Sequence, residues 1–136
     1  MAKTYQIAAI PIRHTELGAV EVLLVTSRGT QRWVVPKGWP WPDRSDWDAA
    51  AGEAWEEAGV RGETSAMSIG SFAYTKRANG LGRELSVHAY VLRVLEEATD
   101  WPEATQRRRS WFSPQMAAEL VAEPDLKLLL RALAAV

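Results

Sequence analysis

Residues 38–60 read GWPWPDRSDWDAAAGEAWEEAGV and contain a helix with well-marked ends and a cluster of acids. Ser45 is suited to cap the start of the helix, with Asp48 three residues later as a weaker, Asp version of the capping box. Gly59 is suited to the left-handed position that follows a helix. The pattern predicts a helix over about residues 46–58, around which the rest of the chain is expected to be organised.

The predicted helix has two different faces. Glu53, Glu56 and Glu57 fall at i, i+3 and i+4 and therefore share one face. Three neighbouring carboxylates repel one another unless a cation lies among them, and carboxylate oxygens suit Mg²⁺ or Mn²⁺. The spacing alone leaves two interpretations open, a divalent-metal site and a solvated acidic face. The separate apolar stripe consists of Trp47, Ala50, Ala51, Ala54 and Ala58.

The whole stretch resembles the Nudix box, G-x5-E-x7-R-E-U-x-E-E-x-G-U, in which U is aliphatic. The matching positions are Gly38, Glu53, Glu56, Glu57, Gly59 and Val60, with Ala54 as an acceptable small residue at the first U. Two positions depart, because Arg44 stands where the family has Glu and Gly52 where it has Arg. In the family this Glu and Arg are thought to help each other orient the site. Losing both avoids the unpaired buried charge that losing one would leave, and we interpret the stretch as a variant box.

The resemblance implies a metal-dependent hydrolase. Glu53, Glu56 and Glu57, with the carbonyl of Gly38, are expected to hold Mg²⁺, and Mn²⁺ is an alternative metal. The same three glutamates are the catalytic candidates, and we favour Glu57 as the base that takes a proton from the attacking water.

Composition and charge limit which class of protein the chain can belong to and which partners it can bind. The 136 residues, 47% hydrophobic and 24% charged, are expected to form one globular domain over 1–136. A net charge of −1 provides no overall field to attract nucleic acid or a membrane. The absence of cysteine excludes disulfides and thiolate metal sites. No apolar run suits a signal peptide or a membrane span, so a cytoplasmic protein is expected, either a monomer or a homodimer.

Strands are expected on both sides of the acidic helix, joined by short polar turns. The predicted strands are residues 5–13, 21–26, 33–35, 67–76 and 84–94, with 111–112 as a further short apolar segment and 77–82 as a loop. The first two are expected to pair as a hairpin. Ser113 and Pro114 predict the start of a helix, and residues 126–133 predict another. With the resemblance, this order predicts an α/β Nudix fold in which a mixed sheet is sandwiched between helices (α/β/α).

Outside the box, the chain looks most like the diphosphoinositol polyphosphate and diadenosine polyphosphate hydrolases of the superfamily. The resemblance covers V-L-L-V at 22–25, W-V-V-P-K-G at 33–38 and D-W-P-E…R-R-R-x-W-F at 100–112. In those relatives basic side chains near these places hold the polyphosphate. The substrate-binding candidates here are Arg28, Arg32, Lys37, Lys76, Arg77, Arg83, Arg107, Arg108 and Arg109.

Several of these residues also have a purely structural interpretation. Lys37 is equally suited to a plain turn before the box, and the three arginines at 107–109 to a solvated turn. His88 falls in a strand pattern, where a packed histidine is commoner than a general acid. The tryptophans before the helix are suited to the core or to a lid, and one of them to stacking on a base.

The leading interpretation is an enzyme that cleaves a phosphoanhydride bond in a polyphosphorylated small molecule by metal-assisted attack of water. The substrate class is a diadenosine polyphosphate or a diphosphoinositol polyphosphate. Arg44 and Gly52 motivate an alternative, a catalytically weak or silent Nudix domain that binds a nucleotide or an inositol phosphate. An RNA 5′ pyrophosphohydrolase is a third interpretation, and the lack of an extended basic stripe counts against it.

Overall fold

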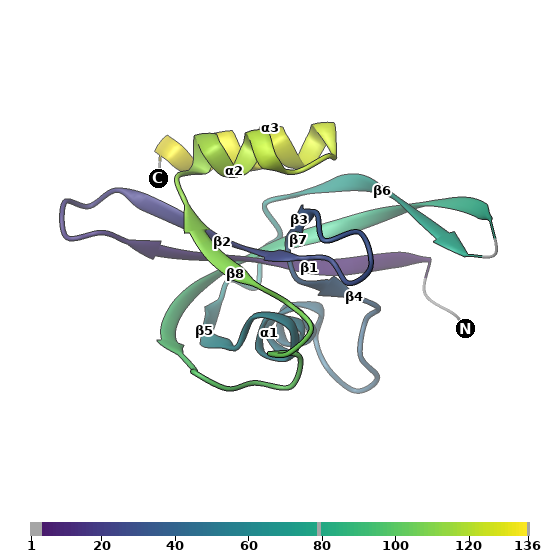
Figure 1. Ribbon diagram of the computed structural model, residues 1–136, viewed down its shortest axis with the longest axis horizontal. Coiled ribbons are helices and arrows are strands. Elements are labelled where there is room, and N and C mark those ends of the chain that lie inside the picture. Colours follow the sequence, from purple (N-terminus) through teal and green to yellow (C-terminus); the bar gives the residue numbers. More distant parts are fainter. Residues whose placement is uncertain (1–3, 79, 136) are drawn as a thin grey trace.

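The computed structural model of the protein describes residues 4–78 and 80–135. A twisted sheet separates α1 (Asp46–Ala58) on one face from α2 (Pro114–Leu120) and α3 (Pro124–Ala132) on the other, and a short 3-10 helix, η1 (Leu133–Ala135), follows α3 (Figure 1). The predicted α/β/α arrangement is confirmed. Among the described residues, every helix is too short or too polar to cross a membrane.

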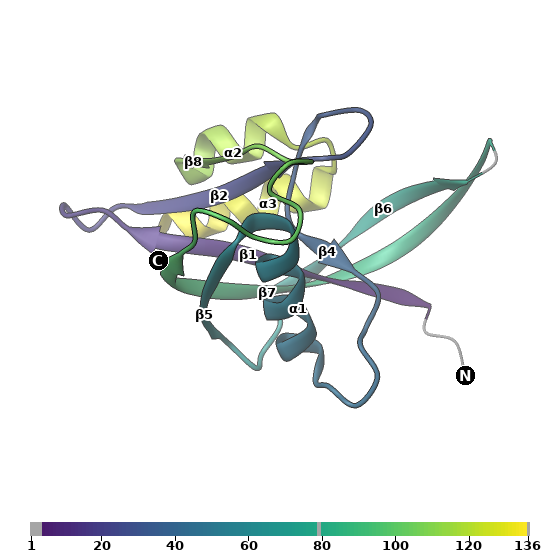
Figure 2. The same cartoon turned by 60° about the horizontal axis from the view of Figure 1, so that its bottom comes forward.

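The sheet is mixed. Its strands in the described part of the chain are β1 (Tyr5–His14), β2 (Val20–Thr26), β3 (Trp33–Val34), β4 (Lys37–Gly38), β5 (Val60–Thr64), β6 (Gly70–Ala78), β7 (Leu81–Glu97) and β8 (Arg109–Phe112). The order is β3-β2-β1-β7-β5, with β4 beside β1, β6 beside β7 and β8 beside β2. Only the central pair among these strands, β1 and β7, is parallel. The β6–β7 hairpin extends beyond the rest of the sheet (Figure 2).

Alternation along the strands divides the core into two layers. On β2, Val22 and Leu24 face α2 and α3, whereas Leu23 and Val25 face α1. Leu126 and Leu130 of α3 fill the first layer. The second layer is closed by the alanines Ala49, Ala50, Ala54 and Ala58. Small side chains let α1 approach the sheet closely, which brings its acidic face next to β4.

The ends of α1 agree with the sequence prediction. Ser45 Oγ accepts a hydrogen bond from the Asp48 N–H at 3.2 Å. Gly59 adopts φ 68° and donates its N–H to the Trp55 carbonyl at 3.0 Å. The predicted apolar stripe was partly wrong, because Trp47 is 37% exposed and Ala49 is buried instead.

Three short strands were not predicted. β5 has only one buried residue, Val60, and forms through backbone pairing to β7. β8 extends the predicted apolar segment by pairing with β2, and β4 contains two residues paired to β1. The predicted loop 77–82 is instead largely strand, because β6 and β7 stay paired up to Ala78 and Leu81, and residue 79 lies outside the described residues.

Candidate active site

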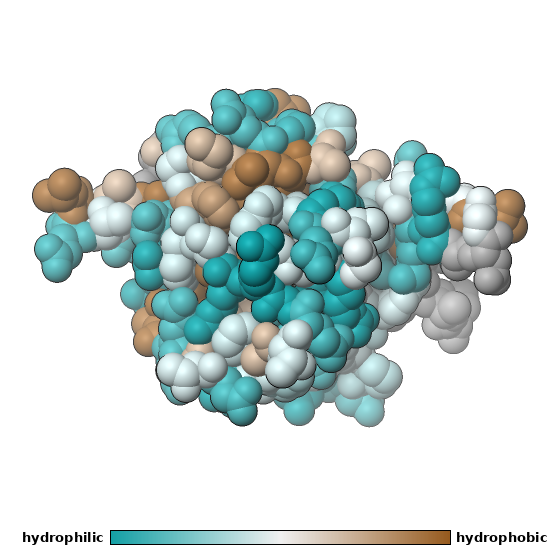
Figure 3. Space-filling view, in the orientation of Figure 1, coloured by the Kyte–Doolittle hydropathy of each residue, from teal (hydrophilic) through white to brown (hydrophobic). Residues whose placement is uncertain are grey.

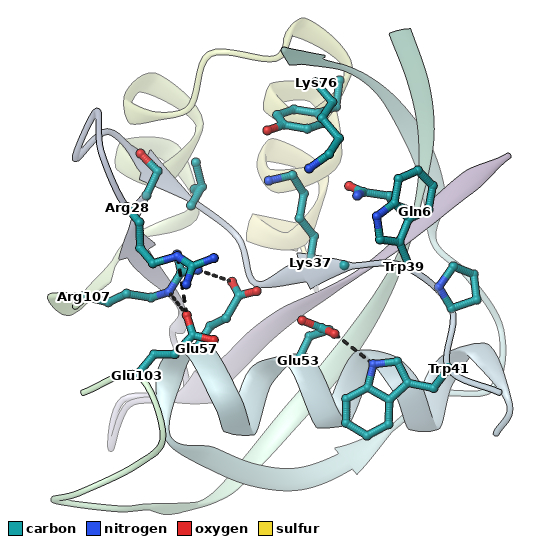
Figure 4. Close-up of a pocket in the computed structure, with 15 residues that line it drawn as sticks. Gln6, Arg28, Lys37, Trp39, Trp41, Glu53, Glu57, Lys76, Glu103 and Arg107 are labelled. Carbon is teal, nitrogen blue, oxygen red and sulfur yellow. Dashed lines mark hydrogen bonds and ion pairs between the residues drawn. The ribbon is translucent and has the colours of Figure 1, made fainter. Parts of the chain in front are cut away.

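A cavity of about 620 Å³ lies between the acidic face of α1 and the strands β3, β4 and β6. Glu53 and Glu57 line it from α1, and Lys37, at the start of β4, lines the opposite wall. Figure 4 shows both carboxylates pointing from the helix toward the space below Lys37. Figure 3 shows the molecular surface in the orientation of Figure 1, and the centre of this surface, below α2 and α3, is hydrophilic. The cavity therefore joins acidic and basic side chains that are distant in sequence.

The carboxylate of Glu53 lies directly against the backbone of Gly38. A β-carbon at Gly38 would stand 2.6 Å from the Glu53 carboxyl carbon, which is closer than real β-carbons approach. The indole of Trp41 donates from Nε1 to Glu53 Oε2 at 2.9 Å. A β-carbon at the box glycine would therefore push this carboxylate away, and in the structure Glu53 is in contact with both Gly38 and Trp41.

Glu57 is 7% exposed, which is unusual for a carboxylate. Burial raises the pKa of Glu57 to about 8, with the charge of Glu53 acting in the same direction and Arg107 opposing it. Burial also raises the pKa of Glu53, against the hydrogen bond from Trp41. The two carboxyl groups interact directly. Close, desolvated carboxylates of this kind are stabilised in the ionised form by a cation between them.

The residues of the cavity fit a hard divalent cation. Glu53, Glu57 and the adjoining backbone of Gly38 supply only oxygen donors, the ligands that Mg²⁺ and Mn²⁺ prefer. No three His, Asp or Glu side chains in the described residues form a ready-made cluster around one point. Glu56 is half-buried, does not line the cavity and contributes its backbone carbonyl to the Glu103 N–H at 3.1 Å. Its place among the metal ligands stays a prediction.

Glu103 is a further carboxylate in the cavity that was not predicted as a site residue. It lies in the segment between β7 and β8, and its Oε1 accepts a hydrogen bond from Arg107 Nε at 2.8 Å. Gln6, also missed, presents a buried side-chain oxygen without a hydrogen-bond partner to the same cavity. Glu103 ends the D-W-P-E segment that resembles the polyphosphate hydrolases, a signal that could have indicated it, whereas Gln6 belongs to no recognisable spacing.

The structure separates the nine basic candidates into three groups. Arg28, Lys37, Lys76 and Arg107 line the first cavity. Arg32 and Arg77 line an adjoining cavity of about 740 Å³, which shares Arg28 and Lys37 with the first. The remaining three, Arg83, Arg108 and Arg109, line neither of these two cavities.

Lys37 stands at the boundary of the two cavities. Its Nζ lies 4.0 Å from the centre of the Tyr74 ring, a distance at which the cation is attracted to the ring face. Burial lowers the pKa of Lys37, while the nearby Glu57 opposes the shift. An anionic ligand that reached this side chain would therefore meet a poorly hydrated positive charge.

Arg109 has a structural position behind the helix. It donates to the carbonyl of Ala58 at 2.7 Å and to the carbonyl of Ala98, and its guanidinium lies 4.0 Å from the centre of the Trp101 ring. It therefore supplies donors to the C-terminal end of α1. Arg108 is exposed beside Trp33. His88 stacks on Tyr5 with ring centres 4.6 Å apart, in agreement with a packed histidine.

The fold and the cavity define an α/β/α domain whose central helix presents carboxylates to a basic pocket. The NUDIX domain family matches residues 4–133, and the chain belongs to this family.

Known proteins similar to the chain agree with this assignment. The chain is 34% identical over 105 residues to Nudix hydrolase 12, mitochondrial, of Arabidopsis thaliana. The match covers 74% of this chain and 52% of that protein. It is 36% identical over 104 residues to diphosphoinositol polyphosphate phosphohydrolase 3-beta of Bos taurus, covering 74% and 60%. The chain thus spans little more than half the length of these relatives. The structure of a C. elegans Ap4A hydrolase binary complex matches with a TM-score of 0.70 and 21% identity, over 98% of this chain and 96% of that one, which shows the shared fold.

Proposed function

We propose that the chain hydrolyses a phosphoanhydride bond in a polyphosphorylated small molecule with Mg²⁺ or Mn²⁺ as cofactor. The observation that carries the proposal is the cavity in which Glu53 and Glu57 lie opposite Lys37, with Arg28, Lys76 and Arg107 around them. Such a cavity suits a substrate that is itself polyanionic and a reaction that builds negative charge on phosphate oxygens. The relatives named for diphosphoinositol polyphosphate and Ap4A hydrolysis support the same substrate class.

Two adjoining cavities favour a substrate with several phosphates. Both are lined by Arg28 and Lys37, so a phosphate chain can continue from the acidic helix into the second cavity. There Arg32 has a buried Nη1 without a hydrogen-bond partner, while its Nη2 lies 3.0 Å from Glu123. A phosphate oxygen would satisfy this donor, whereas a ligand with only two phosphates would leave the second cavity partly empty.

The chain's own residues supply binding, orientation and a proton acceptor. When bound, the divalent cation supplies neutralisation of phosphate oxygens and a lower pKa for a coordinated water. Lys37, Arg28 and Lys76 bind the phosphates. We assign the base to Glu57, because it is buried in the cavity and faces Lys37, with Glu53 and Glu56 as the other catalytic candidates.

A substrate panel with Mg²⁺ tests the proposal. Diadenosine polyphosphates and diphosphoinositol polyphosphates are expected to be hydrolysed with higher kcat/KM than ADP-ribose, and Glu57→Gln is expected to lower turnover about a hundredfold. Glu119→Gln, at an exposed position of α2, is the matched control and should behave like the wild type. Best turnover on ADP-ribose would contradict the substrate class.

The same panel separates the alternatives. Tight binding of a nucleotide or an inositol phosphate without turnover would support the silent domain, and turnover confined to 5′-triphosphorylated RNA would support the RNA 5′ pyrophosphohydrolase. A cytoplasmic location, a single domain over 1–136, the monomeric or homodimeric state and the lack of membrane and nucleic-acid partners stay predictions from the sequence.

A further inference from the structure

Gly52, the glycine in the interior of α1, lies beneath an aromatic ring. A β-carbon at this position would stand 2.3 Å from Cη2 and 2.7 Å from Cζ2 of Trp41. Real β-carbons do not come this close to ring atoms, so any larger residue at 52 would displace the indole. Glycine is unfavourable inside a helix. The contact with Trp41 explains why it is present here.

The same indole reaches a glutamate of the cavity. Trp41 Nε1 donates to Glu53 Oε2 at 2.9 Å while the ring packs on the cluster between α1 and the sheet. Figure 4 shows the indole standing beside the helix with its nitrogen toward the Glu53 carboxylate. Because the ring is fixed by packing, the hydrogen bond fixes the direction of the carboxylate.

We propose that Trp41 is the positioning residue for Glu53 and takes the place of the arginine that the Nudix box has at position 52. The exposed Arg44, at the second variant position, donates its backbone N–H to the Trp41 carbonyl at 3.4 Å. This backbone turn does not depend on the Arg44 side chain, whereas Gly52 makes room for the indole itself. Trp41 supplies a neutral donor from the loop before the helix, in the space that a side chain at position 52 would occupy. The consequence for metal binding rests on the proposed function.

Removing the donor alone tests this role. Trp41→Phe keeps an aromatic side chain in the loop and removes Nε1, so the fold is expected to persist while the dissociation constant for Mn²⁺ alone rises about tenfold, measured by titration calorimetry. Turnover is expected to fall through kcat with little change in KM, because Glu53 is not a phosphate-binding group. Trp47→Phe is the matched control, at a tryptophan of α1 that is 37% exposed and does not line the cavity, and should bind Mn²⁺ like the wild type.

Exchange of the two positions gives an independent readout. Gly52→Arg alone is expected to lower Tm by about 5 °C, because the new side chain meets the indole. In the background of Trp41→Ala, the same Gly52→Arg change is expected to restore Mn²⁺ affinity, since the arginine then has room to reach Glu53. If the double variant binds Mn²⁺ no more tightly than Trp41→Ala, an arginine at position 52 cannot do the work of Trp41, and the proposed equivalence is wrong.

A metal-free measurement distinguishes this inference from the proposed function. The indole N–H resonance of Trp41, identified by its loss in Trp41→Phe, is expected to move in the ¹H–¹⁵N spectrum of Glu53→Ala and to stay in place in Glu119→Gln. An unmoved resonance in Glu53→Ala, or unchanged Mn²⁺ affinity in Trp41→Phe, would overturn the role of Trp41. If the Trp41 resonance moves in Glu53→Ala but the wild type hydrolyses no phosphoanhydride, the result would instead count against the proposed function alone.

Discussion

Arg107 Nη2 lies 3.7 Å from Glu57 Oε1, and both side chains are almost completely buried. The same guanidinium donates to Glu103 at 2.8 Å and to the Thr26 carbonyl at 3.1 Å. Arg107 is therefore already bound on three sides by groups of the protein. Its first effect is to hold two carboxylates in place and to stabilise the ionised form of Glu57, rather than to wait as a free cation for substrate.

Removing this guanidinium is expected to destabilise the protein. Arg107→Ala leaves Glu57 and Glu103 without their shared partner, and breaking a buried ion pair lowers the free energy of unfolding by about 3 kcal/mol. Arg108→Ala, next in the chain but exposed, is the matched control, with an expected change within about 0.5 kcal/mol. Urea unfolding of both variants measures the difference. Equal stability of the two would show that the buried network contributes nothing.

The neighbouring arginine is expected to act on stability without acting on substrate. Arg109→Gln removes the donor to the Ala58 carbonyl at 2.7 Å and the contact with the Trp101 ring, so the free energy of unfolding should fall by about 2 kcal/mol. KM for polyphosphorylated substrates should stay within about twofold of the wild type, since Arg109 does not line the cavity. A marked rise in KM in the folded variant would show that Arg109 takes part in substrate binding after all.

The helix that carries the acids was predictable because its signals are local. Ser45, Gly59 and the spacing of the glutamates all lie within one stretch, and the observed bounds Asp46–Ala58 agree with the prediction. The hairpin of β1 and β2 was likewise encoded by two apolar runs separated by a polar turn. In contrast, β5 and β8 form through pairing with strands that are distant in sequence. Their own residues show no pattern that predicts a strand.

Sequence could not divide the arginines at 107–109 by role. The three are adjacent and chemically identical, yet they follow a turn at residues 102–106 and β8 begins only at Arg109. As a result Arg107 enters the cavity, Arg108 faces solvent and Arg109 reaches the end of α1. The part played by Trp41 was hidden for the same reason, because its contact with Gly52 depends on the path of the loop before the helix.

The buried carboxylate predicts a specific dependence of stability on pH. The pKa of Glu57 rises from 4.5 to about 8. The protonated carboxyl group therefore contributes fully to the free energy of unfolding below pH 4.5, and this contribution is lost as the pH rises through 8. Glu57→Gln does not titrate. In the metal-free protein it is expected to match the wild type at pH 4.5 and to exceed it at pH 9 by on the order of 5 kcal/mol.

Urea unfolding of wild type and Glu57→Gln across this pH range measures the effect, with Glu119→Gln as an exposed control. Mg²⁺ should raise the stability of the wild type and reduce the advantage of Glu57→Gln, because it binds the native state. A stability difference that does not change between pH 4.5 and pH 9 would contradict the assigned environment of Glu57.

Lys37 is expected to contribute to phosphate binding more than to stability. Lys37→Gln removes the half-buried cation between the two cavities, so KM should rise about tenfold for a diadenosine polyphosphate and less for ADP-ribose. Arg93→Gln, in an exposed ion pair with Glu63, removes one positive charge elsewhere and should leave KM unchanged. Steady-state kinetics on both substrates measure the effect. An equal rise in KM for the two substrates would mean that Lys37 does not discriminate between longer and shorter phosphate chains.

Gly38 tests whether Glu53 must lie against the backbone. In Gly38→Ala the new β-carbon would meet the Glu53 carboxyl group at 2.6 Å, and the flexible end of that side chain can swing away. We therefore expect a loss of only about 1 kcal/mol in the free energy of unfolding. Displacement of the carboxylate by about 1 Å should nevertheless lower kcat/KM about a hundredfold and weaken Mn²⁺ binding.

Gly82→Ala on β7 is the matched control for this change. Its β-carbon would meet the flexible ends of two side chains, Thr75 at 3.2 Å and Arg77 Nη1 at 3.3 Å, and neither lines the cavity of Glu53. Mn²⁺ affinity should therefore equal that of the wild type. If Gly38→Ala also retains wild-type Mn²⁺ affinity and turnover, the close approach of Glu53 to the backbone is not needed by the site. A large loss in Gly38→Ala alone would show that the box glycine acts by admitting this one carboxylate.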